Sequence, residues 1–591
     1  MKDTIRIANC SGFYGDKLSA AREMVEGGPI DVLTGDYLAE LTMSILYGQK
    51  MKAPESGYVG TFLKQMREVL TPCKERGIKI VSNAGGLNPK GMAAEVETIA
   101  TELGIDVNVA YIDGDDLMPR LDELRGAGET LTNIESGVAL ADNGYRTLTA
   151  NAYLGAWGIA EALSQGADIV ICPRVTDAAV VIGPAAWKFG WARNDYDALA
   201  GALAAGHIIE CGAQATGGNY AFFQEVPSFH NVGYPIAEIA ADGSFVITKH
   251  AGTGGLVSEG TVTAQLLYEI SAPAYVNPDV VAHFDTLRIT QDGPDRVQVS
   301  GCRGSAPPAT HKVCVNIGTG FRNEMELLLT GLDIEKKAQV FTDTLFAAVG
   351  GREMFDSVHE ELIRSDRADP TNNEAAFASL RLVVKGRDRK RVGRFFSAKV
   401  VELALANFPG FAARNAPGAG RPNIVHWPAL VGSEHLCERV CLGGQMTEVM
   451  PTSQMGLPAM PVPQAETTIP PAPNGPMQEI PFGRLFGTRS GDKGGCANLG
   501  VWAKTDAAYG FLHHVLTVDL LKELLPDTAA YGIDRYDLPN IRALNFYIHG
   551  ILGDGAAASV RLDGQAKTLG EYLRAKMILV PQSLIQEAEA Q

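Results

Sequence analysis

An arginine, a threonine and an aspartate stand within four positions of one another in the run Cys-Pro-Arg174-Val-Thr176-Asp177-Ala. The forked guanidinium of Arg174 can pair bidentately with a substrate carboxylate, and Asp177 can act as a general acid or base. Thr176 offers a hydroxyl beside them. This run predicts a substrate-binding arginine and a catalytic aspartate; its alternative is a structural Arg–Asp pair in which Thr176 or Asp177 caps the next helix.

A second group of proton-transfer residues lies in two glycine-dense segments further along the chain. Glu210 and Cys211 open the run ECGAQATGGNY, and His250 opens the run HAGTGGLVS. Polar residues among glycines in an otherwise apolar chain are typical of loops that line a site. All three are candidate catalytic residues, Cys211 also as a nucleophile, and a hydrogen-bonded structural role is the alternative for each.

Two further glycine-rich turns are candidates for binding an anion. Each follows a predicted strand and precedes a predicted helix, where free backbone N–H groups can face a negative charge. The candidates in the SGFYGD and NAGGLNPKG turns are Gly12, Asn83, Gly85, Gly86 and Lys90. Neither turn matches the Gly-x-Gly-x-x-Gly pattern, so a nicotinamide dinucleotide is not expected. A plain strand-to-helix turn or a capping turn is the alternative.

A charged segment near the C-terminus, GTRSGDKGG at 487–495, carries Arg489, Asp492 and Lys493 among four glycines. Its length between two predicted strands excludes a two-residue hairpin. We therefore predict a loop that forms an anion-binding nest with two cations above it, and a solvated charged loop is the alternative.

The cysteines and histidines form no strong metal motif. Neither the group of His435, Cys437 and Cys441 nor the group of His207, Glu210 and Cys211 has a second ligand pair at the spacing that zinc sites use. The odd number of nine cysteines argues against a disulfide framework. We expect no bound metal.

The elements that must position these residues alternate between strands and helices in the first third of the chain. The predicted strands are residues 5–9, 30–33, 78–82, 107–112 and 167–172, and the predicted helices between them include 17–26, 91–103 and 151–165. This alternation predicts an α/β fold with a doubly wound, mostly parallel sheet. Because the turns after parallel strands share one edge, Gly12, Asn83, Gly86 and Arg174 should line one cleft.

The rest of the chain continues into an α+β region and then a separate small domain. We predict a main domain at 1–450, with 1–190 Rossmann-like and 191–450 α+β, and a proline-rich linker at 451–476 that contains eight prolines. The C-terminal domain at 477–591 should be a compact α+β unit. Its predicted strands are 478–486, 496–503, 541–548 and 557–562, and its predicted helices are 509–525 and 569–577.

Composition bounds the function. The 591 residues are 46% hydrophobic, which excludes disorder, and no apolar run reaches the roughly 18–20 residues of a membrane span. With 68 acidic and 51 basic residues the chain is not expected to bind nucleic acid. The first residues read as a strand without a secretory apolar region, so we expect a cytoplasmic protein.

Several segments together resemble one known family, the acyclic terpene utilisation family of AtuA-like proteins. They are SGFYGD, TGDYLAELTM, NAGGLNPKG, CPRVTDAA, ECGAQATGGNY, GTGGLVSEGTVTAQLLYEI, RSGDKGGCANLGVWA and LNFYIHGILGDG. The resemblance covers nearly the whole chain and implies a ferredoxin-like fold for the C-terminal domain. One departure is Ala178, which stands where the family pattern suggests a serine and so removes a hydroxyl.

The resemblance implies a role in the breakdown of citronellol- and geraniol-type terpenoids, whose acids are processed as coenzyme A thioesters. Together with the site residues it leads us to expect a homo-oligomeric enzyme that acts on a coenzyme A thioester or a related branched-chain acid by hydratase or lyase chemistry. No cofactor is expected beyond the coenzyme A of the substrate. The alternatives are a thioester hydrolase that uses Cys211, and a non-catalytic scaffold or accessory subunit.

Overall fold

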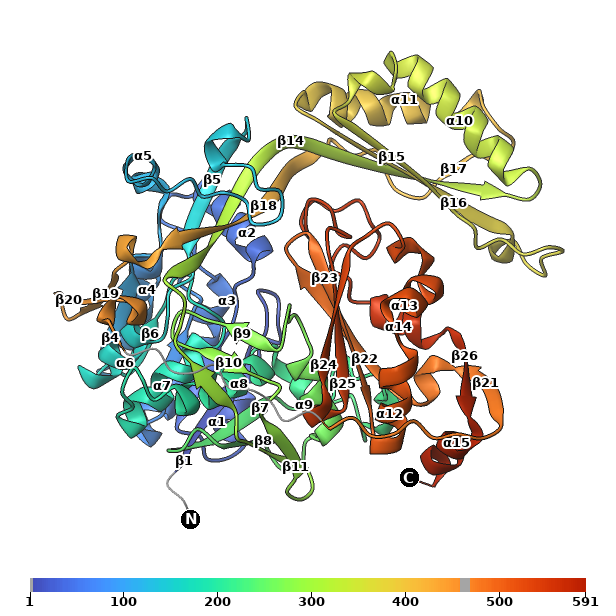
Figure 1. Ribbon diagram of the computed structural model, residues 1–591. Helices are drawn as coiled ribbons and strands as arrows, with labels where there is room; N and C mark the ends of the chain where they lie inside the picture. Colours follow the sequence, from blue (N-terminus) through green and yellow to red (C-terminus); the bar gives the residue numbers. More distant parts are fainter. Residues whose placement is uncertain (1–3, 458–467, 591) are drawn as a thin grey trace.

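Five parallel strands form the centre of the main sheet, in the order β1-β2-β3-β6-β4 (Figure 1). The computed structural model describes residues 4–457 and 468–590. The bounds of these strands, in sheet order, are Thr4–Asn9, Val32–Gly35, Lys79–Ser82, Ile169–Ile171 and Val109–Asp113. Their side chains are mostly buried, as is usual for parallel strands covered on both faces. The predicted parallel α/β sheet is confirmed here.

Helices cover both faces of this parallel centre. Their bounds are α1 Ala20–Glu26, α2 Glu40–Lys50, α3 Gly60–Arg76, α4 Pro89–Leu103, α5 Leu121–Gly126, α6 Trp157–Ser164, α7 Ala179–Phe189 and α8 Tyr196–Ile209. The prediction of one helix over 151–165 was wrong at its start, because the strand β5 (Arg146–Ala152) pairs with another strand there. The alanine-rich helix begins only at Trp157.

Antiparallel strands extend the sheet on both sides to eleven strands. On the β1 side they are β7 Pro235–Ala240, β8 Phe245–Lys249, β12 Arg296–Ser300 and β11 Arg288–Gln291, and on the β4 side β19 Glu438–Leu442 and β20 Gln445–Val449. The chain after residue 190 thus adds strands to the sheet that the chain before it begins. A small sheet of β9 (Ala274–Val276), β10 (Val281–His283) and β13 (Arg303–Ser305) and the helix α9 (Glu259–Leu266) lie between these strands in sequence. A turn separates β10 from β11, and in it the Thr286 N–H donates to His283 O.

A long strand, β14 (Thr310–Thr330), joins the main body to a protruding lobe, here residues 321–421 (Figure 1). Its first half pairs with β5 and with β18 (Arg421–Gly432), and its second half pairs with β16 (Phe377–Gly386), which pairs with β15 (Ser357–Ile363). The lobe also contains α10 (Ile334–Val349), β17 (Ala412–Ala413) and α11 (Phe396–Glu402) and buries an apolar core of its own.

The C-terminal domain is a four-stranded antiparallel sheet in the order β22-β23-β25-β24, covered by helices. The strands are β22 Phe486–Lys493, β23 Cys496–Ala503, β25 Ala543–Ile548 and β24 Ile533–Leu538, and a separate pair is β21 Met477–Pro481 with β26 Met577–Pro581. The helices are α12 Asp506–Val515, α13 Val518–Leu524, α14 Leu569–Arg574 and α15 Gln582–Glu589.

Three element predictions in this domain were wrong. Residues 557–562 form turns rather than a strand, and β24 supplies the fourth strand instead. The predicted strand 478–486 is divided between β21 and β22. The predicted helix 509–525 is divided into α12 and α13, because Thr517 caps a new helix through its side chain. The middle of the predicted linker, 458–467, lies outside the described residues.

Within the described ranges, none of the helices is long and apolar enough to cross a membrane.

Candidate functional site

The turns that follow the parallel strands meet at one edge of the main sheet. After β2, the Asp36 backbone N–H donates to Ser11 O in the turn after β1. After β3, the Asn83 side chain donates to Asp36 Oδ1 over 2.6 Å and accepts from the Tyr37 backbone N–H over 2.9 Å. Asn83, predicted to bind an anion, is therefore buried and fixes the orientation of Asp36.

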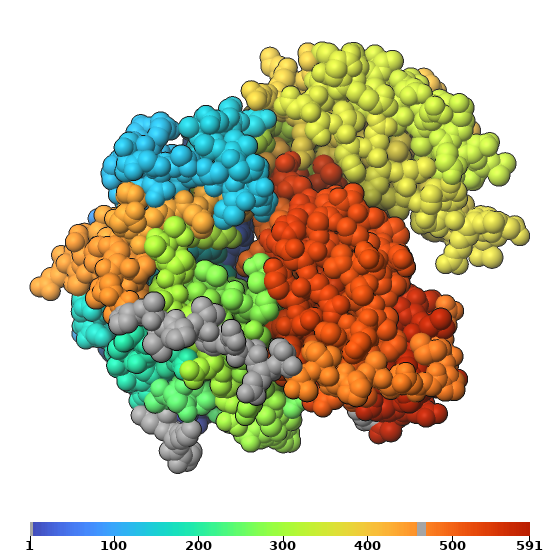
Figure 2. Space-filling view, viewed as in Figure 1, coloured from blue at the N-terminus to red at the C-terminus, as the bar shows by residue number. Residues whose placement is uncertain are grey.

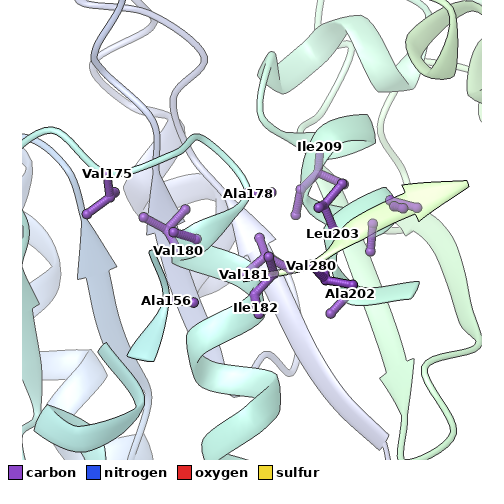
Figure 3. Close-up of a cluster of buried hydrophobic side chains, with 14 of the residues drawn as sticks. Ala156, Val175, Ala178, Val180, Val181, Ile182, Ala202, Leu203, Ile209 and Val280 are labelled. Carbon is purple, nitrogen blue, oxygen red and sulfur yellow. The ribbon is translucent and has the colours of Figure 1, made fainter. Parts of the chain in front are cut away.

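Two packed helices bring Asp177 and Glu210 together at the same edge. Asp177 lies two residues before α7 and Glu210 directly follows α8, and the two helices run side by side with apolar side chains between them (Figure 3). The approach depends on Gly206, where a Cβ would stand only 2.8 Å from the Cβ of Ala178. The helix pair thus carries two acidic residues 33 positions apart into one cluster.

Asp36, Asp177 and Glu210 form a compact carboxylate cluster, with one oxygen of each within 4.8 Å of the others. Glu210 Oε2 is buried and has no hydrogen-bond partner in the described part of the chain. Burial raises the pKa values of Asp36 and Glu210 well above their ordinary range, and the Asp177 charge raises both further. Adjacent carboxyls of this kind share protons, which suits acid–base catalysis near neutral pH.

Arg174 is enclosed behind this cluster. Its Nη1 donates to Asp177 Oδ1 over 2.8 Å and to Val175 O over 3.0 Å, and its guanidinium lies 4.1 Å from the centre of the Tyr153 ring. Only 3% of its side chain is exposed. Arg174 therefore orients Asp177 from within the fold.

The charged segment of the C-terminal domain reaches the carboxylate cluster as a hairpin. The prediction of a long loop was wrong: Lys493 pairs directly with Cys496, so the turn is only Gly494-Gly495, with Gly494 at φ +65°. Such a left-handed position favours glycine. The strand β22 instead continues through Arg489, Asp492 and Lys493 and carries their side chains to the interface.

Two of these side chains, Lys493 and Arg489, lie against tyrosine rings of the main domain. Lys493 Nζ lies 5.5 Å from the centre of the Tyr275 ring, and its charge acts on both Glu210 and Glu269. The Arg489 guanidinium lies 4.1 Å from the centre of the Tyr268 ring, and its buried Nε and Nη2 have no hydrogen-bond partner among the described residues. Arg489 therefore brings these two donors to the buried face between the domains.

Glu269 joins the site from the segment after α9. Its φ of +57° is unusual for a glutamate, and Asn498 of the C-terminal domain fixes this conformation by accepting from the Glu269 backbone N–H over 2.8 Å. Lys567 pairs with the Glu269 carboxylate at 3.2 Å. Burial raises the pKa of Glu269 to about 7 against the opposing charge of Lys493. Burial, and then the charge of Glu269, raise the pKa of Asp492 to about 8.

Glu40 and Lys312 form a further ion pair within electrostatic range of these groups, with Lys312 Nζ 3.3 Å from Glu40 Oε1. Tyr153 also donates to Glu40, over 3.0 Å. Burial alone would raise the pKa of Glu40, but Lys312, His426 and Arg174 hold it well below its ordinary range. The site thus combines the carboxylate of Glu40, whose pKa is lowered, with the carboxyls of Asp36 and Glu210, whose pKa values are raised.

Cys211 lies next to the cluster but lacks the environment of a nucleophile. Burial and the Glu210 charge raise the pKa of its thiol well above the ordinary value, whereas a catalytic cysteine needs a lowered pKa. The Nδ1 atom of nearby His207 is 3.4 Å from Glu210 Oε1. Burial and Lys493 lower the pKa of His207 to about 4, so its imidazole is neutral at pH 7.

The remaining predicted residues lie around the site or away from it. His250 binds Met24 O through Nε2 at 2.9 Å and packs against Gly27, which follows α1. Lys90 is exposed on the first turn of α4. Thr176 donates to Asn277 Oδ1 over 3.1 Å.

The predicted glycines pack closely against other parts of the fold. A Cβ at Gly12 would stand 2.5 Å from the carbonyl carbon of Cys211, and a Cβ at Gly85 would stand 2.6 Å from Cys172 O. Gly86 adopts φ +52°. These glycines allow the turns to approach one another, and Asn88 caps α4 in the same segment, as the capping alternative predicted.

Several residues of the site were missed from the sequence. They are Asp36, Glu40, Glu269, Lys312 and Lys567. Asp36 was detectable, because it directly follows β2 at the edge of the sheet where the other predicted residues lie. Glu269 and Lys567 become site residues only through the packing of the C-terminal domain, which no local pattern predicts.

The three clustered carboxylates could offer oxygen ligands to a hard divalent cation. Arg174 and Lys493 already supply positive charge to the same oxygens, so the geometry suits proton sharing as well as metal binding. A second group of Glu129, Glu434 and His435 lies apart from this site.

The fold and this site define a two-domain α/β protein whose carboxylate cluster is covered by a small C-terminal domain. The family model of the acyclic terpene utilisation family protein AtuA matches residues 5–442, and the model of the AtuA ferredoxin-like domain matches residues 480–579. The chain therefore belongs to the AtuA family, which ties it to acyclic terpene utilisation. A comparison with curated proteins finds no match.

Proposed function

We propose that the protein is a hydratase or lyase that moves a proton at the α-carbon of an acyl thioester or related branched-chain acid. The observation that carries this proposal is the cluster of Asp36, Asp177 and Glu210 beside Lys493, a cation from the other domain. Such chemistry needs a proton donor and acceptor together with positive charge near the thioester oxygen. The cluster supplies both kinds of group.

In the proposed hydration, water adds across an α,β-double bond. One carboxylate of the cluster removes a proton from the water as its oxygen attacks the β-carbon, and a protonated neighbour delivers a proton to the α-carbon. Lys493 stabilises the negative charge that develops on the thioester oxygen. The lyase direction reverses these transfers, so the same residues would serve both.

The cationic side of the site suits a second, negatively charged group on the substrate. Arg489 has two buried nitrogens without a hydrogen-bond partner in the ranges that the structure describes, and Lys567 and Arg489 lie beside the same Tyr268 ring. A guanidinium with free donors is suited to a carboxylate. This supports a branched-chain acid that carries a carboxylate in addition to its thioester.

The two alternative functions have weaker support. A hydrolase that uses Cys211 would need a thiolate, which the raised pKa of this thiol disfavours. A scaffold would not explain why six acidic and five basic side chains gather around one interface, where many of them are removed from water. The acidic residues are Asp36, Glu40, Asp177, Glu210, Glu269 and Asp492, and the basic residues are Arg174, Lys312, Arg489, Lys493 and Lys567.

Mass spectrometry of the protein incubated with a panel of acyl-coenzyme A esters tests the proposal. We expect one or more unsaturated branched esters to gain the mass of one water, and the reaction to disappear in Glu210→Gln. Release of free coenzyme A that survives in Glu210→Gln and disappears in Cys211→Ala would support the hydrolase instead. A panel in which no ester is bound or changed would favour the scaffold.

A further inference from the structure

A row of like charges crosses the sheet where the lobe joins the main domain. Arg322 on β14 lies directly opposite Lys385 on β16 and opposite Arg421 on β18. Directly opposed residues of antiparallel strands project from the same face about 5 Å apart, where like charges destabilise the sheet. Burial lowers the pKa of Arg322, and the charge of Arg421 lowers it further.

More basic side chains surround this row. The Arg387 guanidinium lies 4.6 Å from the centre of the Tyr145 ring, and that of Arg389 lies 5.7 Å from the centre of the Phe321 ring. Residues 385–394 contain six basic and one acidic residue in a chain of net charge −17. We define the basic neck as Arg146, Arg322, Lys385, Arg387, Arg389 and Arg421.

The protein only partly neutralises the basic neck. Lys385 pairs with Asp554 at 2.8 Å, and Arg322 donates to Ser559 O over 3.1 Å and lies 3.6 Å from Glu324. The Nε of Arg322, whose side chain is 4% exposed, has no hydrogen-bond partner in the described ranges.

Two exposed members of the neck, Arg387 and Arg389, lie against aromatic rings. Among the residues described, Arg146, Arg387, Arg389 and Arg421 form no ion pair with a carboxylate. The excess positive charge therefore favours an external anion.

The basic neck borders the candidate site. The loop that holds Asp554 lies against the β22–β23 turn, since Leu552 N–H donates to Gly495 O over 2.9 Å. That turn follows Lys493. On the main-domain side, β14 carries Lys312 and, about 20 Å further along at roughly 3.3 Å per residue, Gly318, which pairs with Arg146 of the neck; Arg322 follows on the same strand. In Figure 2 the red C-terminal domain meets the yellow lobe and the blue segment that contains α5 and β5.

We propose that the basic neck binds the phosphate groups of the nucleotide end of the substrate, whose thioester then lies at the carboxylate cluster. This inference rests on the proposed function. Arginine forks are well suited to phosphate oxygens, and a coenzyme A thioester carries its phosphates and its reactive carbonyl at opposite ends of an extended pantetheine arm. The separation between neck and cluster along β14 accommodates such an arm.

The test compares coenzyme A, dephospho-coenzyme A and pantetheine as probes in titration calorimetry. The variant is Arg387→Gln with Arg421→Gln, which neutralises two exposed side chains without touching the carboxylate cluster. We expect the Kd of coenzyme A to rise about a hundredfold in this double variant, roughly tenfold for each arginine removed. The Kd of dephospho-coenzyme A should rise less, and that of pantetheine should not change. The matched control removes two exposed charges elsewhere, in Arg288→Gln with Lys336→Gln, and should leave every Kd unchanged.

Turnover of an acyl-pantetheine thioester separates this inference from the proposed function. Unchanged turnover in the Arg387→Gln, Arg421→Gln variant, together with its weakened binding of coenzyme A, supports the inference. Equal Kd values for coenzyme A in wild type and variant would overturn it and leave the proposed function standing. Tighter binding of an RNA oligonucleotide than of coenzyme A would also overturn it. If neither thioester is bound or turned over, the proposed function fails and the inference fails with it.

Discussion

Two buried carboxylate clusters in the main domain differ in what their oxygens contact. Glu438 accepts hydrogen bonds from the backbone N–H groups of Gly155 and Gly158, at 3.1 and 2.6 Å, and Asp279 accepts from Ala156 with both oxygens at 3.0 Å. These donors are at the start of α6, where free N–H groups need acceptors. In this cluster the carboxylates serve the helix.

In the cluster of Asp36, Asp177 and Glu210, one Glu210 oxygen has no partner among the described residues, and the neighbours are other charged side chains. Burial raises the pKa of Glu438 to about 7 and that of Asp279 to about 6, so a raised pKa is common to both clusters. Asp36 accepts one backbone N–H, from Leu38 over 3.2 Å, so what distinguishes the candidate site is the Glu210 oxygen that is left without a donor in the described part of the chain. Hydrogen-bond partners, rather than pKa values, therefore separate the candidate catalytic carboxyls from the structural ones.

Neutralising the cluster should give the largest effect. Glu210→Gln should lower kcat by about 10²–10⁴-fold, the usual contribution of general acid–base catalysis. The melting temperature should stay the same or rise, because the substitution removes a carboxyl that its neighbours repel. Steady-state kinetics with an accepted ester and thermal melting measure the two effects.

The matched variant at the structural cluster is Glu438→Gln. It leaves one of two backbone N–H groups without an acceptor, at a cost of about 1–3 kcal/mol. We expect a lower melting temperature and nearly normal kcat in the folded fraction. A large loss of kcat in Glu438→Gln together with normal kcat in Glu210→Gln would contradict the roles assigned to the two clusters.

Removing the cation that the C-terminal domain contributes should have the next largest effect. Lys493→Met should reduce kcat by about 10²-fold, as expected when one preorganised charge is lost from a developing oxyanion. Lys522→Met, in α13 of the same domain, is the control and should behave like wild type. Equal activity of the two variants would show that the C-terminal domain does not contribute to the chemistry.

The pH dependence of stability should follow Glu269 and Asp492. Their folded pKa values of about 7 and about 8 exceed the ordinary values of 4.5 and 3.8, so each holds a proton in the folded state that the unfolded state has lost. Stability should therefore be greatest at low pH in this window and fall as the pH rises through 7 and 8. Melting temperatures from pH 5 to 9 should decline less in Glu269→Gln with Asp492→Asn than in wild type.

The smallest effect is expected from chelation. Because Arg174 and Lys493 balance the carboxylate charges, we expect turnover of the purified protein to be unchanged by excess EDTA. Added Mg²⁺ or Mn²⁺ should not raise it. A loss of turnover that one of these ions restores would instead place a metal on Asp36, Asp177 and Glu210.

The parallel centre of the fold was predictable because its strands are short buried runs that alternate with helices. From the same pattern, Asp177 and Asn83 could be placed at one edge of the sheet. The place of the antiparallel strands in this sheet was harder to predict, because their partners are distant in sequence: β19 pairs with β4, more than 300 residues earlier. Such non-local pairing leaves no local signal.

The hairpin at Lys493 shows how a local pattern can mislead. The glycines of GTRSGDKGG suggest a loop, but Gly491 lies within a strand, where a Cβ would stand 2.6 Å from the Tyr268 ring. The glycine is needed for close packing between domains rather than for a turn. Only the interdomain contact distinguishes the two reasons.

The most direct test of the central claim is proton exchange at the α-carbon. The protein is incubated in D₂O with an accepted ester, and deuterium in the recovered ester and product is measured by mass spectrometry. We expect one deuterium at the α-carbon with wild type and with Glu438→Gln, and none above background with Glu210→Gln. Equal deuterium incorporation by Glu210→Gln and wild type would contradict it.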